Sequence, residues 1–560
     1  MTAAAQRPCV LIVTGGLVTE KETSLLHALR KQSLQRRFAK SAWLDHKIRL
    51  TTAEPLLCGL MERRSLRSRD LHERYFDDPT QVQTPELTEV VLATLLRDAG
   101  IAYRLATYGE LFQDGRRARQ LLDECDCVFA STTLLRDMSE VEPLLRFLKR
   151  PHNRIVLGGA LAGLICDRWP GMDEVDVLCV GYGELLVPAL VDWMLSGYRR
   201  LDPPATGRVY TRGPSRVLHS GVPADRDLDF LTTPDWALSA KDRGIDYGMV
   251  YYESVRGCPY RCAFCNYPYL FDDVKFRYKS ASRMVDDWER YARELNVRYI
   301  TCLDSLFTMP KRRLREFCLL MIDRKVPVKW ICYARADDLA DESLVELMIK
   351  AGAHQVQIGI ESGHQQILDN MDKVCTVEAN AEALRNCRKH GLTTVVSLIV
   401  GYPGETAQTL ESTCEFLRAT PPDFYYLATF STRAAGVPVL NAENRQRFGL
   451  QTADNSHCMA PYWQHSSMSC AEVGNHVRQL NRRLMRDRIS LNATLFYAGL
   501  LNFDPADRET LLDFQQRVAD SHRLTRYAFD VANRWVDYRL RKDMARWFVQ
   551  QTNYEAASRA

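Results

Sequence analysis

Two successive series of alternating apolar and amphipathic segments constrain the fold of this chain more than any other feature. In each series, short runs rich in Val, Ile, Leu and Cys alternate with longer segments of helical periodicity. Such alternation favours parallel sheets that are covered by helices on both faces. The first series falls within residues 1–200 and the second within residues 246–435. The sequence therefore predicts an α/β protein with two sheet domains.

The first series predicts a Rossmann-like domain whose strands end in glycine or in small hydroxyl residues. In doubly wound sheets, ligands bind across the carboxyl ends of the strands. Gly15–Gly16 follow the first strand, and the further candidate ligand contacts are Ser131, Thr132, Thr133, Gly158, Gly159, Gly181, Gly183 and Glu184. Tight turns that bind nothing are the alternative explanation for these glycines. An insertion at about 20–85 is expected to be mostly helical, and the sequence assigns it no function.

The second series contains about six strand–helix units, too few for a closed eight-unit barrel. We therefore predict a partial, open-sided (β/α)6 barrel over residues 246–435. Residues 201–245 are rich in Pro, Gly and Asp and are expected to form a linker. Long amphipathic segments after residue 436 predict a mostly helical C-terminal region over 436–560.

Three of the 17 cysteines have a spacing suited to metal chemistry: Cys258, Cys262 and Cys265, as C-x3-C-x2-C after a strand. A 4Fe–4S cluster takes four ligands, normally Cys thiolates. Three thiolates on one loop leave the fourth iron open to chelate the amino and carboxylate groups of a substrate. Structural zinc would need a fourth Cys or His nearby, but the nearest downstream His is His354. A ferredoxin-like electron-transfer cluster would need a fourth Cys at close range, and Cys302 lies inside a strand. Most other cysteines lie in apolar segments and are expected to be small buried hydrophobes.

This motif, with the aromatic Phe264 before its last cysteine, resembles the radical S-adenosylmethionine superfamily. The segments IGIESG (358–363) and SLIVGYPGET (397–406) are similar to those that approach the ribose and the adenine in that superfamily. The resemblance implies that S-adenosylmethionine binds at the strand ends, with candidate contacts at Asp304, Arg335, Glu361, Ser362 and Ser397. Taken singly, each of these residues could equally cap a helix or form a turn.

The glycine-rich strand ends of the first domain, upstream of the cysteines, resemble the cobalamin-binding domain of class B radical methyltransferases. The resemblance implies cobalamin as a second cofactor. The D-x-H-x-x-G signature of other cobalamin proteins is absent, since Asp45–His46 has the wrong spacing and lies in the insertion. The lower axial position is therefore expected to be empty, or filled by water or another side chain.

Several segments after the cysteine loop and in the C-terminal region are similar to the phosphinate P-methyltransferases of phosphinothricin-type antibiotic biosynthesis. This implies that the reduced cluster cleaves S-adenosylmethionine, that a 5′-deoxyadenosyl radical activates the substrate, and that methylcobalamin delivers the methyl group. A phosphinate substrate needs cationic partners, and the candidates are Arg433, His465, His476 and Arg478. A C-methyltransferase, a non-methylating radical cyclase or rearrangement enzyme, and a cluster-bearing sensor remain alternatives.

Composition and hydropathy exclude other classes. The chain has 74 Lys and Arg against 70 Asp and Glu, and a net charge of +4 over 560 residues is too weak to indicate nucleic acid binding. It has no apolar run of the roughly 18–20 residues that would span a bilayer, and its N-terminus lacks the pattern of a signal peptide. We expect a cytoplasmic enzyme with a small-molecule substrate, an external electron donor of the flavodoxin or ferredoxin type, and no nucleic acid or membrane partner.

Overall fold

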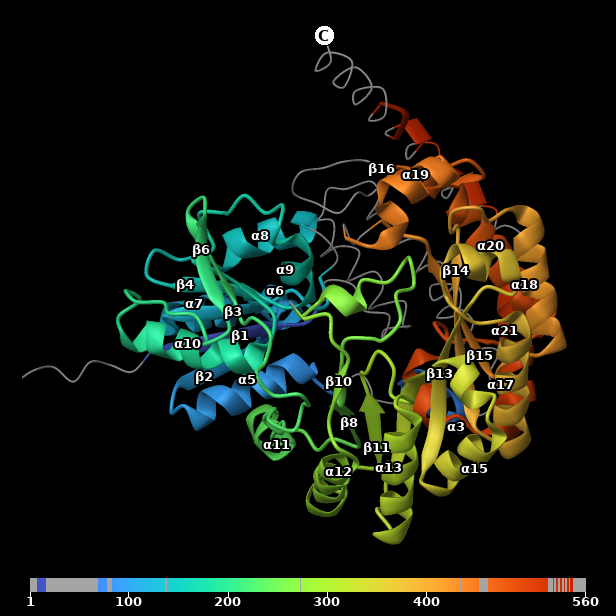
Figure 1. Cartoon of the computed structure of the whole chain (residues 1–560), viewed down its shortest axis with the longest axis horizontal. Coiled ribbons are helices and arrows are strands. Elements are labelled where there is room, and N and C mark those ends of the chain that lie inside the picture. The colour runs from blue at the N-terminus through green and yellow to red at the C-terminus, as the bar shows by residue number, and fades with distance from the viewer. Residues whose placement is uncertain are drawn as a thin grey trace, which may run out of the picture.

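The computed structural model describes residues 8–16, 69–77, 83–135, 138–271, 273–432, 436–452 and 462–521, and scattered residues between 527 and 546. Two sheet domains lie side by side, and the C-terminal helices pack along the second (Figure 1). Each domain has one seven-stranded, mainly parallel sheet, which confirms the predicted α/β fold class. Within the described ranges, no helix combines the length and apolarity that crossing a bilayer requires.

The N-terminal sheet has the strand order β2-β1-β3-β4-β5-β7-β6. Its parallel strands β1, β3 and β5 are largely or fully buried, as expected for a sheet covered on both faces. The strands are β1 (Cys9–Thr14), β2 (Ala102–Thr107), β3 (Cys127–Ser131), β4 (Arg154–Gly158), β5 (Val177–Val180), β6 (Arg208–Arg212) and β7 (Ser215–His219). The covering helices are α5 (Leu87–Asp98), α6 (Tyr108–Gln113), α7 (Gly115–Glu124), α8 (Met138–Leu148), α9 (Ala160–Ile165) and α10 (Gly183–Leu195).

The N-terminal sheet extends beyond the expected boundary at residue 200. Strands β6 and β7 form a hairpin in which β7 pairs parallel with β5. The turn between them contains Gly213 at a φ of +52° and Pro214, residues that made this stretch resemble a linker. Residues 208–219 therefore belong to the first sheet domain, and helix α11 (Trp236–Arg243) lies between this hairpin and the second domain.

The second sheet has the order β19-β15-β14-β13-β12-β11-β8. Six of these strands are successive and parallel, as the sequence predicted, and a two-residue strand adds to the edge. They are β8 (Met249–Tyr252), β11 (Tyr299–Cys302), β12 (Lys329–Ala334), β13 (Ala353–Glu361), β14 (Thr393–Val400), β15 (Phe424–Thr429) and β19 (Leu491–Asn492). Their helices are α12 (Ala281–Leu295), α13 (Lys311–Asp323), α14 (Ala336–Leu339), α15 (Glu342–Lys350), α16 (Gln365–Asn370), α17 (Val377–His390) and α18 (Ala407–Ala419).

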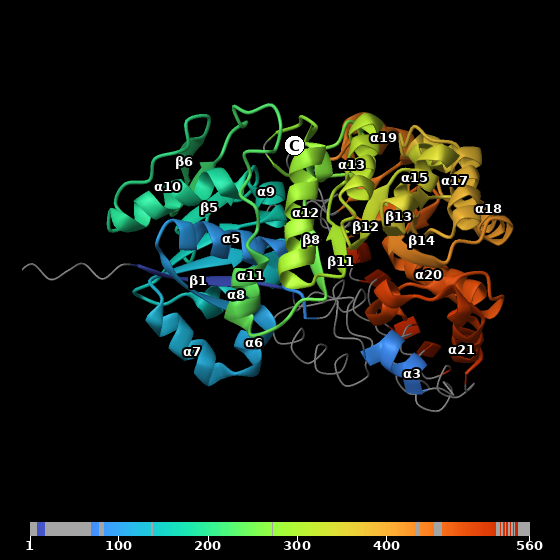
Figure 2. The same cartoon turned by 90° about the horizontal axis from the view of Figure 1, so that it is seen from below.

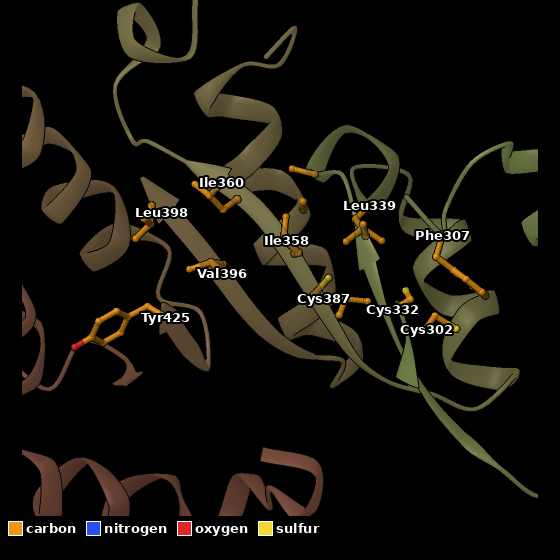
Figure 3. Packing of buried hydrophobic residues seen from close by; sticks show 14 of the residues in the cluster. Cys302, Phe307, Cys332, Leu339, Ile358, Ile360, Cys387, Val396, Leu398 and Tyr425 are labelled. Carbon is orange, nitrogen blue, oxygen red and sulfur yellow. The ribbon is translucent and has the colours of Figure 1, made fainter. Parts of the chain in front are cut away.

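Alternate residues of these strands pack under the helices and form the core of the barrel domain. Figure 3 shows Cys302, Cys332 and Cys387 packed among Ile358 and Val396. All three cysteines are fully buried, which confirms their role as small hydrophobes. The intervening strand residues consequently face the other, concave side of the sheet.

Residues 69–77, from the insertion to which the sequence assigned no function, close one end of the barrel. Helices α3 (Arg69–His72) and η1 (Glu73–Asp77) lie beside α21 (Arg508–Asp520), as Figure 2 shows, and η1 packs against η4 (Tyr497–Asn502). Tyr75 is fully buried; its hydroxyl donates to Asp507 at 2.8 Å and accepts from the Asp504 N–H at 3.0 Å. The same apolar cluster includes Phe424 at the start of β15. This packing therefore covers the amino-terminal end of the strands.

The C-terminal region is mostly helical, as predicted, but it also contains a small antiparallel sheet. Helix α20 (Cys470–Arg486) follows this three-stranded sheet, which lies near the carboxyl end of β14 through Trp463 and His465. The three strands of this sheet are β16 (Gln451–Thr452), β17 (Trp463–His465) and β18 (Met468–Ser469). The C-terminal region also contains η3 (Pro438–Leu440), α19 (Ala442–Phe448) and η5 (Pro505–Asp507).

We predict that Tyr75→Ala lowers the free energy of unfolding by about 3–5 kcal/mol, since it removes a fully buried ring and leaves a cavity. Tyr527, which is 67% exposed, provides the control, and Tyr527→Ala should stay within about 0.5 kcal/mol of wild type. Urea denaturation of both variants measures the difference. Equal effects would contradict the proposed closure of the barrel by residues 69–77.

Candidate active site

The three-cysteine loop begins at the carboxyl end of β8 and is held there by the strand next to it. Asp304, which follows β11, is buried and accepts hydrogen bonds from the N–H groups of Ser254 and Val255 at 2.6 and 2.9 Å. Its second oxygen accepts the Ser254 hydroxyl at 2.5 Å, and Ser305 donates to the carbonyl of Gly257 at 2.7 Å. The structure thus gives Asp304 a role in positioning the loop, and its contact with S-adenosylmethionine stays a prediction.

Cys258, Cys262 and Cys265 are half-buried free thiols on this loop. Burial, together with the neighbouring Cys262 and Cys258, raises the pKa of Cys265 to about 11. In the part of the chain that is described, no three His, Cys, Asp or Glu side chains converge on one point as a single metal ion would require. Cysteine thiolates are the usual ligands of a 4Fe–4S cluster, so the chemistry of the three side chains fits such a group.

Two buried cations lie beside the cysteines. The guanidinium of Arg335 lies 3.8 Å from the centre of the Tyr260 ring, within the cysteine loop, and donates to the carbonyls of Lys373 and Val374 at 2.8 Å each. Burial raises the pKa of Cys262, while the charges of Lys373 and Arg335 lower it. These cations therefore favour the thiolate form that a cluster requires. The sequence analysis predicted Arg335 at this site but missed Tyr260 and Lys373.

Glu361 ends β13 next to the same loop. Its carboxylate pairs with Lys373 at 3.2 Å, and its φ of +63° is uncommon for a residue other than glycine. A Cβ on Gly359 would lie 2.4 Å from the Glu361 carboxylate, so this glycine leaves room for the pair. The structure thus brings Glu361 and Arg335 together near the cysteines.

The two predicted serines have different surroundings. Ser362 is buried, and its hydroxyl lies 3.3 Å from that of Thr413 and accepts the His364 N–H at 3.2 Å, so it stabilises a turn. Ser397 is partly exposed on β14, in register with Gly359. Because its neighbours on the strand lie in the helix-covered core, Ser397 faces the concave side of the sheet.

The turn after β14 is held from two directions at Gly401. The Glu405 carboxylate accepts the Gly401 N–H at 2.5 Å, and burial raises the pKa of Glu405 to about 8. From the C-terminal region, His465 donates from Nε2 to the Gly401 carbonyl at 3.1 Å. The sequence analysis did not single out Glu405, although it lies in the quoted segment GYPGE.

His465 was predicted as a cationic substrate partner, and the structure corrects this. The ring is buried, stacks on Trp463 with centroids 5.4 Å apart, and its Nδ1 accepts from Ser467 at 3.1 Å. Burial lowers the pKa of His465, so the neutral ring serves as a structural link. Sequence alone could not reveal this, because burial of an isolated histidine leaves no local signal.

The other three cation candidates remain predictions. His476 lies in α20, half-buried, and burial lowers its pKa while Glu472 opposes the shift. Arg478 donates to Asn475 in the same helix, and Arg433 lies outside the described residues.

The N-terminal sheet offers a second site, at the point where its strand order reverses. The chain passes from β1 to β2 on one side and then to β3 on the other, so the ends of β1 and β3 form the switch point where ligands bind in such folds. Gly16 lies at this point, where a Cβ would be 3.0 Å from the carbonyl of Leu134. Leu134 itself is 43% exposed. Cobalamin binding at this end of the sheet stays a prediction.

The predicted contacts at this edge divide into packing residues and outward-facing residues. Thr132 donates from its N–H and its hydroxyl to the Gly158 carbonyl, each at 2.7 Å. Gly159 has a φ of +99°, and a Cβ there would lie 2.8 Å from Thr133. By contrast, a Cβ on Gly183 would meet nothing within 4 Å. The Ser131 hydroxyl lies 3.2 Å from that of Thr133 and keeps this loop compact.

Gly181 and Glu184 contact other parts of the protein. A Cβ on Gly181 would lie 2.1 Å from the Ser220 hydroxyl, so close packing requires glycine there. Glu184 forms two hydrogen bonds with Arg256, at 2.7 and 2.9 Å, across the boundary between the domains. Its contact with cobalamin stays a prediction.

The profile of the Radical SAM superfamily matches residues 252–417, which include the three cysteines and most of the barrel strands. An anaerobic magnesium-protoporphyrin IX monomethyl ester cyclase of Rubrivivax gelatinosus is 30% identical over 264 residues, which are 46% of this chain and 47% of that protein. The chain spans about half the length of the curated relatives it matches.

Two solved structures share the architecture over most of the chain. TsrM, a radical S-adenosylmethionine methyltransferase from Kitasatospora setae, has a TM-score of 0.54 at 16% identity, over 80% of this chain and 96% of that one. OxsB, a cobalamin-dependent radical enzyme, has a TM-score of 0.57 at 14% identity, over 99% of this chain and 80% of that one. At this identity, the likeness shows a shared fold.

Asp304 should make the stability of the radical SAM domain depend on pH. Burial raises its pKa from 3.8 to about 6. Because the folded state holds this proton more tightly, the stabilisation is complete below pH 4 and is lost as pH rises through 6. This rise in the pKa of Asp304 corresponds to about 3 kcal/mol of unfolding free energy. Relative to Asp304→Asn, wild type should lose about this much unfolding free energy between pH 4 and 7 in urea titrations. A difference that does not change with pH would contradict this.

Proposed function

We propose that the protein is a cobalamin-dependent radical S-adenosylmethionine methyltransferase. Its cofactors are a 4Fe–4S cluster, S-adenosylmethionine and methylcobalamin, and an external electron donor of the flavodoxin or ferredoxin type reduces the cluster. The observation that carries this proposal is the loop of three half-buried cysteines at the carboxyl end of a parallel barrel, next to a second sheet whose strand order reverses between β1 and β3. OxsB was solved with aqua-cobalamin and S-adenosylmethionine, and TsrM with an S-adenosylmethionine analogue, which supports the same cofactor set.

The chain's own residues bind and orient the cofactors. When bound, a reduced cluster supplies the electron that cleaves S-adenosylmethionine, and methylcobalamin supplies the methyl group. Cys258, Cys262 and Cys265 hold the cluster, and Lys373 and Arg335 lower the pKa of Cys262 in opposition to its burial. Because the amino-terminal end of the barrel is closed, ligands reach the barrel from its carboxyl end.

The methyl acceptor in our proposal is the phosphorus of an H-phosphinate intermediate in natural-product biosynthesis. Support comes from the similarity of the C-terminal segments to phosphinate P-methyltransferases. A second candidate, C-methylation of an apolar substrate, is favoured by two side chains at the carboxyl end of the barrel, Leu303 (38% exposed) and Tyr333 (40% exposed). TsrM, solved with tryptophan, provides a precedent for such a substrate.

We predict that Cys262→Ala abolishes 5′-deoxyadenosine formation in protein reconstituted anaerobically with iron, sulfide and methylcobalamin. Cobalamin binding should persist, because the two sites lie in different domains. Cys375→Ala is the matched control: Cys375 is half-buried near the loop but donates to Asn380 at 3.1 Å. In wild type, equal amounts of S-adenosylhomocysteine and 5′-deoxyadenosine would support methyl transfer. Deoxyadenosine alone would argue against it, and loss of cluster in both variants would contradict the ligand assignment.

Phosphorus NMR separates the two acceptors. An H-phosphinate substrate shows a large one-bond P–H coupling, which should disappear as a P–CH3 product forms. Retention of the P–H coupling in a product that has gained a methyl group would instead indicate C-methylation. No methylated product from any H-phosphinate would contradict the phosphorus assignment while leaving the methyltransferase proposal intact.

A further inference from the structure

A buried ion pair joins the two sheet domains next to the cysteine loop. The carboxylate of Glu184, in the first turn of α10, accepts from Nη1 and Nη2 of Arg256 at 2.9 and 2.7 Å. Arg256 lies in β9 (Val255–Arg256), and both side chains are only 8% exposed. Two parallel N–H···O bonds fix the orientation of a guanidinium as well as its position.

Both domains surround the Arg256 guanidinium. Glu253 of the barrel domain accepts from its Nε and Nη2 at 3.0 and 2.7 Å. The ring of Tyr182, from the N-terminal domain, lies 4.9 Å from the guanidinium carbon, and that of Phe271, beyond the cysteine loop, lies 5.0 Å away. The guanidinium is therefore packed between aromatic rings and carboxylates from two domains, which leaves it little freedom to move.

The ion pair connects the two candidate cofactor sites by a short stretch of chain on each side. Arg256 is two residues before Cys258, and Gly257 between them lies close to the backbone of Lys275. Glu184 follows Gly181 by three residues, at the end of β5. Phe271 packs near this strand end as well, since its carbonyl would be 3.3 Å from a Cβ on Gly181.

We propose that Glu184 and Arg256 are positioning residues that set the separation between the cluster loop and the cobalamin-binding edge, and thereby couple radical formation to methyl transfer. This proposal rests on the proposed function. Radical formation needs only the barrel domain, whereas methyl transfer needs substrate and methyl donor held within reach of each other. A misplacement of about 1 Å can cost on the order of 10²-fold in rate. Loss of the pair should therefore lower methyl transfer more than radical formation.

The test compares Glu184→Gln and Arg256→Lys with Arg508→Lys in the reconstituted holoenzyme. Arg508 forms a comparable ion pair with Asp423, in which both side chains are 19% exposed, at the opposite end of the barrel. In the first two variants, the ratio of 5′-deoxyadenosine to methylated product should rise about tenfold or more. Iron content should stay near the wild-type value in both variants, and cobalamin affinity should stay near it in Arg256→Lys. Arg508→Lys should leave the ratio unchanged.

Hydrogen–deuterium exchange on the same proteins, without turnover, provides the second measurement. Amides in 181–186 and 255–265 should exchange at least about tenfold faster in Glu184→Gln and Arg256→Lys than in wild type, because breaking a buried ion pair is strongly destabilising locally. Faster exchange with a raised product ratio supports the proposal. Unchanged exchange, or a parallel loss of both products, overturns it. A wild type that forms no methylated product refutes the proposed function separately, since exchange reports on the ion pair in any case.

Discussion

The placement of one short loop is the constraint on which the candidate site depends. Three thiols must approach one cluster, yet the loop between Cys258 and Cys265 has no regular structure of its own to hold them. The barrel supplies the restraint: the Asp304 carboxylate accepts the N–H groups of Ser254 and Val255, and Arg335 covers the ring of Tyr260. Because these groups are buried, each lost hydrogen bond would leave an unsatisfied polar group, at a cost of about 1–3 kcal/mol. The loop is therefore positioned by residues on neighbouring strands.

The same principle extends to the other strand ends. Two of them carry a buried polar contact that fixes a turn: Lys373 with Glu361 after β13, and Glu405 with Gly401 after β14. The C-terminal region adds His465, which donates to the carbonyl of Gly401. These contacts are short-range and directional, and together they hold the carboxyl end of the barrel rigid. Ser397, a predicted ligand contact, lies among them on the concave face.

Sequence patterns predicted the parts of this protein that local periodicity determines. Buried strands such as β3 and β5 are continuous apolar runs, and the cysteine spacing needed no structural context. Sequence patterns did not predict the roles of residues whose burial and partners depend on contacts far away in the sequence. Glu184 finds its partner 72 residues away, and His465 reaches Gly401 over a separation of 64 residues, so neither role is visible locally. The hairpin β6–β7 looked like a linker because its turn residues outweighed two five-residue strands, of which β6 is largely exposed and β7 largely buried.

The barrel is closed by Tyr75 and by Phe496, the residue before η4, whose rings pack edge to face, and this closure has a consequence for folding. These residues lie on opposite sides of the radical SAM segment in the sequence, so the sheet cannot bury its amino-terminal end until the ribosome has released most of the chain. During synthesis, that apolar end stays exposed to water and to chaperones. A fragment cut at the limits of the family match would carry the same exposed surface and should aggregate. The autonomous folding unit is thus larger than the segment that the family profile matches.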